Sequence, residues 1–110
     1  MSQFAFLYRG GDPRPASPAQ LQQRMEKWLA WFKDLADKGH ITDRGIPLDW
    51  SGAVVTKARD VTDGPYAEKD LVIGLTVVEA RDLAHASELS LGCPIFEQHG
   101  CIEVRPVLTL

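Results

Sequence analysis

Two stretches of this chain are apolar on both faces of a strand, and they constrain the fold more than any other feature. Residues 3–9 place Phe4, Phe6 and Tyr8 on one face and mainly apolar side chains on the other. Residues 71–78 form a second such run of eight residues. A chain of 110 residues has enough helical sequence to cover only one face of such a sheet. We therefore expect a second copy of the chain to cover the other face.

The longest predicted helix spans residues 18–38 and is long enough to cover one face of the sheet. Ser17 and Gln20 have the spacing of a capping box at its start, and a glycine follows its last residue. A second, shorter helix is predicted over residues 82–91, where Asp82 is a suitable N-cap. Apolar side chains recur along the long helix at helical spacing: Leu21, Met25, Trp28, Leu29, Phe32, Leu35 and Ala36.

The predicted elements follow the order β-α-β-β-α-β. Strands are also predicted over residues 53–61 and 100–107, whereas residues 41–47 form at most a short strand before a turn. This order is that of the ferredoxin-like fold, an α+β arrangement in which an antiparallel sheet carries both helices on one face. We expect residues 1–110 to be a single domain. Two such sheets meeting face to face would give a homodimer, a dimeric α/β barrel.

The charge and the apolar runs of the sequence argue against two classes of partner. Lys and Arg number 12 against 15 Asp and Glu, and the net charge of −3 provides no basic surface for nucleic acid. No apolar run approaches the ~20 residues of a membrane-spanning helix. Residues 1–7 lead directly into strand-like sequence, without the pattern of a signal peptide. We therefore expect no nucleic acid, no membrane and a cytoplasmic location.

The cysteines and histidines predict no metal site and no cofactor. Cys93 and Cys101 are too few for a disulfide framework, and their spacing fits no zinc motif. We interpret them as free thiols in a reducing cytoplasm. His40, His85 and His99 are scattered, and none has another ligand-type residue at helical or ribbon spacing.

The best candidate for a functional site is the turn over residues 63–69, Asp-Gly-Pro-Tyr-Ala-Glu-Lys. It holds two carboxylates, a phenol and an ammonium group within seven positions. Asp63 either accepts hydrogen bonds from backbone N–H groups of the turn or acts as a general acid or base. Tyr66 either packs under the loop or donates to a ligand oxygen. Glu68 and Lys69 are expected to form a solvated pair.

Four further residues are candidates for ligand binding. Arg9 ends the first strand beside a Gly-Gly loop, where it either binds an anionic ligand or forms a surface salt bridge. Trp28 and Trp31 lie on the predicted long helix, Trp28 in its apolar stripe and Trp31 off the centre of the stripe, where Trp31 either covers the rim of the core or an interface, or stacks on a ligand. His99 lies in a late loop, from which it could approach the site across a dimer interface.

The turn also begins a stretch that resembles a known family, the YCII-related proteins. Residues 61–69 are similar to the Asp-Gly-Pro-Phe signature of one of its subgroups, with Tyr66 in the place of Phe. Residues 79–83, 92–94 and 102–107 then resemble the family's motif at the second helix, its Cys-Pro and its closing Glu-Val-Arg-Pro. The resemblance is tight over this stretch and looser, though in register, before it.

This resemblance implies a bacterial protein that forms a dimeric α/β barrel of ferredoxin-like subunits, with a site in the cleft beside the central sheet. Some relatives look enzymatic, with a His–Asp pair as the proton-transfer unit, and related domains are joined to sigma-factor-type regulators. Asp63 matches the aspartate of that pair. The predicted helix over residues 18–38 contains no histidine, so the pair is incomplete in this chain.

Three functional hypotheses follow. The first is a homodimeric ligand-binding or accessory protein whose cleft, near the turn from Asp63 to Tyr66, takes a small organic ligand. The second is an enzyme that performs proton transfer or elimination on a small organic substrate, with Asp63 as acid or base. The third, a regulatory partner of the transcription machinery, rests on the family resemblance alone. The incomplete His–Asp pair favours the first.

Overall fold

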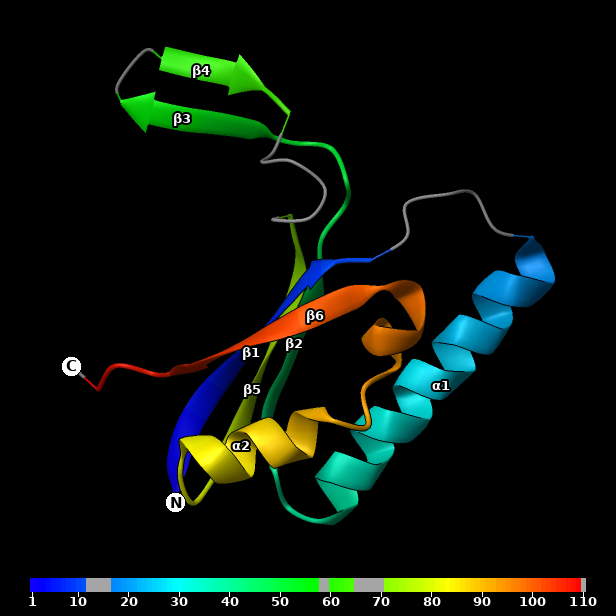
Figure 1. The fold of residues 1–110 in the computed structure, drawn as a ribbon, viewed down its shortest axis with the longest axis vertical. Coiled ribbons are helices and arrows are strands. Elements are labelled where there is room, and N and C mark those ends of the chain that lie inside the picture. The colour runs from blue at the N-terminus through cyan, green and yellow to red at the C-terminus, as the bar shows by residue number, and fades with distance from the viewer. Residues whose placement is uncertain (12–16, 58–59, 65–70, 110) are drawn as a thin grey trace.

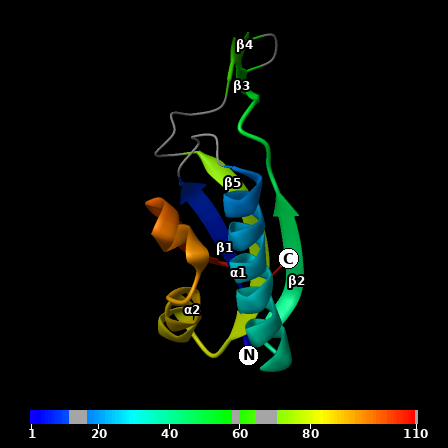
Figure 2. The same cartoon turned by 90° about the vertical axis from the view of Figure 1, so that its right-hand side faces the viewer.

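A two-layer arrangement of one sheet and two helices forms the body of the protein. The computed structural model describes residues 1–11, 17–57, 60–64 and 71–109. Helices α1 (Pro18–Asp37) and α2 (Leu83–Ser90) both lie on the same face of the sheet (Figures 1 and 2). A 3₁₀ helix over Pro94–Gln98 follows α2 on that face.

The main sheet has four strands, and all neighbouring strands are antiparallel. Its order is β2-β5-β1-β6, which is the strand order expected for the ferredoxin-like β-α-β-β-α-β arrangement. The predicted α+β fold class is therefore confirmed. The strands are β1 (Ser2–Gly10), β2 (Ile41–Pro47), β5 (Val72–Ala80) and β6 (Gly100–Pro106).

The prediction of a single strand over residues 53–61 is wrong. This part of the chain forms a separate two-stranded sheet of β3 (Ala53–Lys57) and β4 (Asp60–Asp63), which stands away from the main sheet (Figures 1 and 2). The strand beside β5 is β2, which we expected to be short at most. Residues 41–47 can form a full strand because Gly45 lies in a β-bulge and Pro47 is the last residue of the strand. At these positions neither residue interrupts the pairing with β5.

The helices begin where the sequence predicts. The Ser17 hydroxyl accepts from the backbone N–H of Gln20 at 3.2 Å, and the Gln20 side chain accepts from the N–H of Ser17 at 2.9 Å. These two bonds form the predicted capping box of α1. Asp82 caps α2 by accepting from the N–H of His85 at 2.8 Å.

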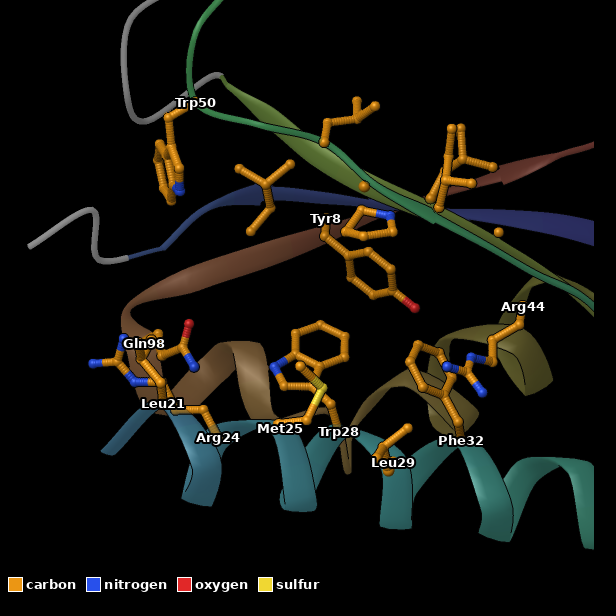
Figure 3. A pocket seen from close by; sticks show the side chains of 17 residues that line it. Tyr8, Leu21, Arg24, Met25, Trp28, Leu29, Phe32, Arg44, Trp50 and Gln98 are labelled. Atoms are coloured by element: carbon orange, nitrogen blue, oxygen red, sulfur yellow. The ribbon is translucent and has the colours of Figure 1, made fainter. Parts of the chain in front are cut away.

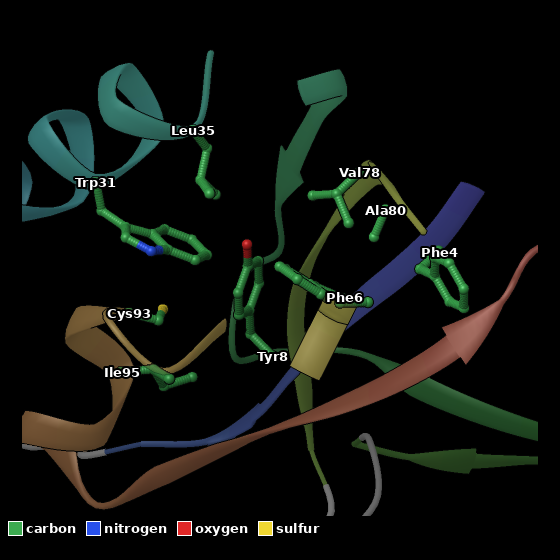
Figure 4. Packing of buried hydrophobic residues seen from close by; sticks show 10 residues of the cluster. Phe4, Phe6, Tyr8, Trp31, Leu35, Val78, Ala80, Cys93 and Ile95 are labelled. Atoms are coloured by element: carbon green, nitrogen blue, oxygen red, sulfur yellow. The ribbon is translucent and has the colours of Figure 1, made fainter. Parts of the chain in front are cut away.

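The hydrophobic core lies between the helices and one face of the sheet (Figure 4). Phe6, Val78 and Ile95 have no solvent exposure. Phe4 pairs with Val78 across β1 and β5, and this register brings the inward side chains of the two strands together. The core consists of Phe4, Phe6, Tyr8, Trp31, Leu35, Val78, Ala80, Ala86, Cys93 and Ile95.

The opposite face of the sheet carries apolar side chains without a helix over it. Leu7 pairs with Leu75, and Ala5 pairs with Val77, so these four side chains alternate with the core residues and point away from the helices. All four are half-buried. Within the described ranges both α-helices lie on the other side of the sheet (Figure 2).

Candidate functional site

A cavity of about 440 Å³ lies between α1 and the edge of the sheet formed by β2 and β5 (Figure 3). Side chains of α1 form one wall, and β2 with the segment after it forms the facing wall. Tyr8 of β1 and residues 73–75 of β5 form the floor, and Gln98 closes one end. Most of the lining is apolar, with a few polar groups at the ends.

One part of the apolar side of α1 packs in the core, and the other part forms the helical wall of the cavity. Trp31 and Leu35 are buried in the core, at 8% and 3% exposure. Leu21, Met25 and Leu29 belong with Leu35 to the predicted stripe, but they are 54%, 59% and 42% exposed and line the cavity. The spacing of the stripe does not distinguish core from cavity, because both need apolar side chains on one side of the helix.

The facing wall is shaped by a β-bulge at Gly45. The register of β2 against β5 shifts between Asp43 and Ile46, and Gly45 has a φ of 77°. The carboxylate of Asp43 accepts from the N–H of Gly45 at 2.8 Å and so fixes the turn. A Cβ atom at Gly45 would lie 1.7 Å from the carbonyl oxygen of Leu75, so the close approach of the two strands requires glycine.

A buried chain of hydrogen bonds anchors this bulge to the floor of the cavity. The Tyr8 hydroxyl donates to the hydroxyl of Thr76 at 2.8 Å, and the Thr76 hydroxyl donates to the carbonyl oxygen of Arg44 at 2.9 Å. Burial raises the pKa of Tyr8 well above its usual range, so the phenol stays protonated and remains a donor at neutral pH. The backbone of Arg44 is thus held from inside the protein.

Arg44 extends from the bulge over the aromatic part of the helical wall. The Cζ atom of its guanidinium lies 5.5 Å from the centre of the Phe32 ring, a cation–π contact. Trp28 is next along the wall, and its ring meets the ring of Tyr8 edge to face at 5.0 Å. Figure 3 shows Arg44 and Phe32 together at one end of the cavity and Arg24 with Gln98 at the other.

Both arginines of the cavity lack a carboxylate partner among the residues that the structure describes. The ion pairs in these residues involve other cations, such as Lys27 with Glu97 and Arg9 with Glu103. Arg24 is half-buried and Arg44 is exposed. The cavity therefore presents an apolar middle with a positively charged group at each end.

The residues predicted from the sequence as ligand contacts lie in different places. Trp28 lines the cavity, whereas Trp31 lies in the core behind it. Arg9 is on β1, where its guanidinium donates to Glu103 at 2.8 Å and, together with Arg105, lowers the pKa of that carboxyl. His99 has a left-handed backbone, with φ of 62°, in the turn before β6. Neither Arg9 nor His99 belongs to the described lining of the cavity.

The predicted turn over residues 63–69 lies largely outside the described residues. The backbone of Asp63 pairs with Ala53 at the end of the β3–β4 hairpin. The side chain of Asp63 and all of Tyr66 lie outside the described part of the chain. Their predicted roles as acid or base and as ligand donor stay predictions.

The sequence reasoning did not identify Arg24, Arg44 or Trp50 as site residues. The Asp-Arg-Gly of residues 43–45 is a signal for a turn with a positive φ, and such a turn within a strand indicates a bulge. Trp50 lines the cavity at the end where Arg24 lies. Its position follows from a turn at Asp49, whose carboxylate accepts from the N–H of Trp50 at 2.7 Å.

The cavity is lined by apolar side chains, two arginines and a few uncharged polar groups. Among the described lining residues there is no carboxylate, imidazole or thiol, and the phenol of Tyr8 is held in its neutral form. The described residues also contain no cluster of three or more side chains suited to a metal ion. No helix in the described ranges is long and apolar enough to cross a membrane.

Comparison with known proteins relates the chain to one family. Residues 6–110 match the family model of the YCII-related domain. The match includes every described residue that lines the cavity. A comparison with curated proteins finds no match.

Proposed function

The chain belongs to the YCII-related domain family, and on that premise we propose that it is a small-molecule-binding protein whose ligand occupies the cavity between α1 and the sheet. The family match by itself assigns no activity to this chain, so the proposal rests on the site. A cavity of about 440 Å³ falls within the ~300–1,000 Å³ typical of small-ligand pockets.

The observation that carries this proposal is the exposed apolar stripe of α1. Leu21, Met25 and Leu29 are each at least 42% exposed, although they face the sheet across the cavity. Leaving side chains of this size in water forgoes about 1.5–3 kcal/mol for each one that could be fully buried. An apolar ligand between α1 and β2 would cover them, and the aromatic wall of Trp28 and Phe32 suits a planar ligand.

We further propose that the protein acts as a homodimer through the uncovered sheet face. Leu7 and Leu75 lie on the two central strands of the sheet, and the pairing of β1 with β5 places them side by side on that face. Face-to-face packing of two sheets is the common way to bury such a surface. The cavity lies on the opposite side of the sheet, so dimer formation through this face leaves the ligand site accessible.

Ligand binding is favoured over proton transfer by the composition of the described lining, which offers no acid or base that titrates near neutral pH. Catalysis with Asp63 remains the alternative proposal. Asp63 ends β4, and β5 begins at Val72 and contributes Ile73 to the lining of the cavity.

A cavity-filling variant tests the proposal. Titration calorimetry with 2-naphthol, a neutral planar probe, is expected to show one site for each chain. Met25→Trp places a larger ring in the cavity and is expected to weaken this binding at least about tenfold. Leu91→Trp is the matched control, because Leu91 is 72% exposed and lies outside the cavity lining. Absence of binding, or equal binding by all three proteins, would overturn the proposal.

A further inference from the structure

We propose that the ligand is an elongated organic dianion, with a planar apolar body and an anionic group at each end. This inference rests on the proposed function, because it names the class of molecule that the same cavity takes. It follows from the positions of the two guanidinium groups and from what lies between them.

The Arg44 end of the cavity is a preformed anion site. The bulge at Gly45 and the bond from the Thr76 hydroxyl to the Arg44 carbonyl fix the backbone. The contact with the ring of Phe32, at 5.5 Å, positions the guanidinium. A guanidinium held in this way loses little side-chain freedom when it binds a carboxylate through two parallel hydrogen bonds.

The Arg24 end combines a second cation with a neutral donor. Gln98, from the 3₁₀ helix, lies beside Arg24 in the lining (Figure 3). Both residues also line a second, polar groove of about 200 Å³ between α1 and that helix. Lys27 and Glu97 of this groove pair with each other at 2.9 Å, and Arg24 is the cation that lines both the groove and the cavity.

The two ends lie on different turns of α1, far enough apart for an elongated ligand. Arg24 and Phe32, which carries the Arg44 contact, are eight positions apart on α1. A rise of 1.5 Å per residue makes this about 12 Å. Met25, Trp28 and Leu29 lie between them, and they offer only apolar contacts and one indole N–H.

Charge at both ends of the ligand follows from the cost of leaving a cation unpaired. An apolar ligand takes water away from both guanidinium groups without replacing its hydrogen bonds. A ligand with one anionic group pairs one guanidinium and leaves the other partly desolvated. A dianion pairs both, and charge-assisted hydrogen bonds are about twice as strong as neutral ones.

Three probes that share a naphthalene ring but differ in charge test this inference separately from the proposed function. They are naphthalene-2,6-dicarboxylate, 2-naphthoate and 2-naphthol, and binding of each is measured by titration calorimetry with the full chain. The dicarboxylate is expected to bind about tenfold more tightly than 2-naphthoate. The difference is expected to shrink as NaCl is raised, because salt screens exposed charge pairs.

Two single variants test whether the arginines cause the preference for the dicarboxylate over 2-naphthoate. Arg24→Gln and Arg44→Gln are each expected to remove the preference for the dicarboxylate over 2-naphthoate, and binding of 2-naphthol to each variant checks that the cavity is still formed. Arg81→Gln is the control for net charge, since Arg81 is exposed and lies outside the cavity lining. It is expected to behave as the wild-type chain does.

The outcomes distinguish failure of the dianion inference from failure of the proposed function. If 2-naphthol binds but the dicarboxylate and 2-naphthoate bind equally, the dianion inference fails and the proposed function stands. A preference that survives both Arg24→Gln and Arg44→Gln also overturns the inference. If none of the three probes binds the wild-type chain, both proposals fail.

Discussion

At Gly45 the backbone of β2 approaches β5 so closely that no side chain fits. The consequence reaches the site, because this bulge carries Arg44 and sets the width of the cavity between β2 and α1. The hydrogen bonds from Tyr8 to Thr76 and from Thr76 to Arg44 connect the same bulge to the core. One position thus couples the stability of the sheet edge to the shape of the cavity.

Replacement of Gly45 by Ala is expected to lower the free energy of unfolding by about 2–4 kcal/mol, from left-handed strain and steric overlap together. Urea denaturation measures the change. Gly39→Ala is the matched control: Gly39 has a φ of 79°, but a Cβ there meets no atom within 4 Å. Its cost is expected to stay near 1 kcal/mol. Equal costs at the two positions would show that β2 does not approach β5 as described.

Cys93 is a free, buried thiol of the core, and Cys101 is a free, exposed thiol on β6. Burial raises the pKa of Cys93 to about 12 from its ordinary value of 9.0. Above pH 9 the unfolded chain therefore loses this proton before the folded chain does. Folding stability must then fall as the pH rises from about 9 to about 12.

The decline in stability that Cys93 causes is expected to be on the order of 1 kcal/mol per pH unit. Chemical denaturation between pH 8 and pH 11 measures it. Cys93→Ala is expected to flatten the decline, while Cys101→Ala should leave it as in the wild-type chain. The buried phenol of Tyr8 contributes a decline of the same sign in all three proteins. A Cys93→Ala variant with an unchanged slope would contradict the burial of this thiol.

Helix α1 shows how an element can be predicted well and its function missed. Its bounds, its capping box and its apolar stripe all follow from local sequence, because each depends on residues within a few positions. Which part of the stripe reaches the core depends on how far the sheet extends beneath the helix. That is a long-range property, and so the stripe alone did not show that Leu21, Met25 and Leu29 line a cavity.

The β3–β4 hairpin is the element whose placement the sequence did not predict. Its β-branched residues indicate a strand, but they do not say which sheet it joins. Val55 and Val61 face each other across the hairpin and are 63% and 62% exposed. A two-stranded hairpin of this kind is marginally stable unless something packs against it.

Hydrogen exchange of the backbone amides tests the independence of this hairpin. The amides that bond β3 to β4 are expected to exchange at least about a hundredfold faster than those between β1 and β5, because the hairpin opens without unfolding the core. The comparison within one sample serves as the control. Equal protection of the two sets would show that the hairpin is covered, for instance by a second chain.

On the scale of the whole molecule, the sheet is apolar on both faces, and α1 and α2 cover one of them. The sequence predicted this asymmetry from residues 3–9 and 71–78, and the pairing of Leu7 with Leu75 on the helix-free face agrees with it. It did not predict the cavity on the other face, because the cavity forms where β2, a glycine-containing edge strand, faces the first half of α1. The assembly that covers the apolar face remains our proposal.

A charge at the centre of the helix-free face is expected to separate the proposed dimer. Leu75→Arg places a guanidinium against Leu7 and would bury an unpaired charge in a face-to-face dimer, at a cost of several kcal/mol. Sedimentation equilibrium at micromolar concentration is expected to show a dimer for the wild-type chain and a monomer for the variant. Leu91→Arg, at an exposed position outside the sheet, is the control and should remain dimeric. A monomeric wild-type chain would contradict the proposed assembly.

The three tryptophans give the most direct test that the cavity beneath α1 is the ligand site. Trp28 and Trp50 line the cavity, whereas Trp31 is 8% exposed and belongs to the core behind it. Their indole N–H resonances, assigned by single Trp→Phe variants, are followed by NMR during titration with 2-naphthol. We predict that the signals of Trp28 and Trp50 move together to saturation and that the signal of Trp31 moves least. Saturable binding that leaves Trp28 and Trp50 unmoved, or no movement of any of the three signals, would contradict the account.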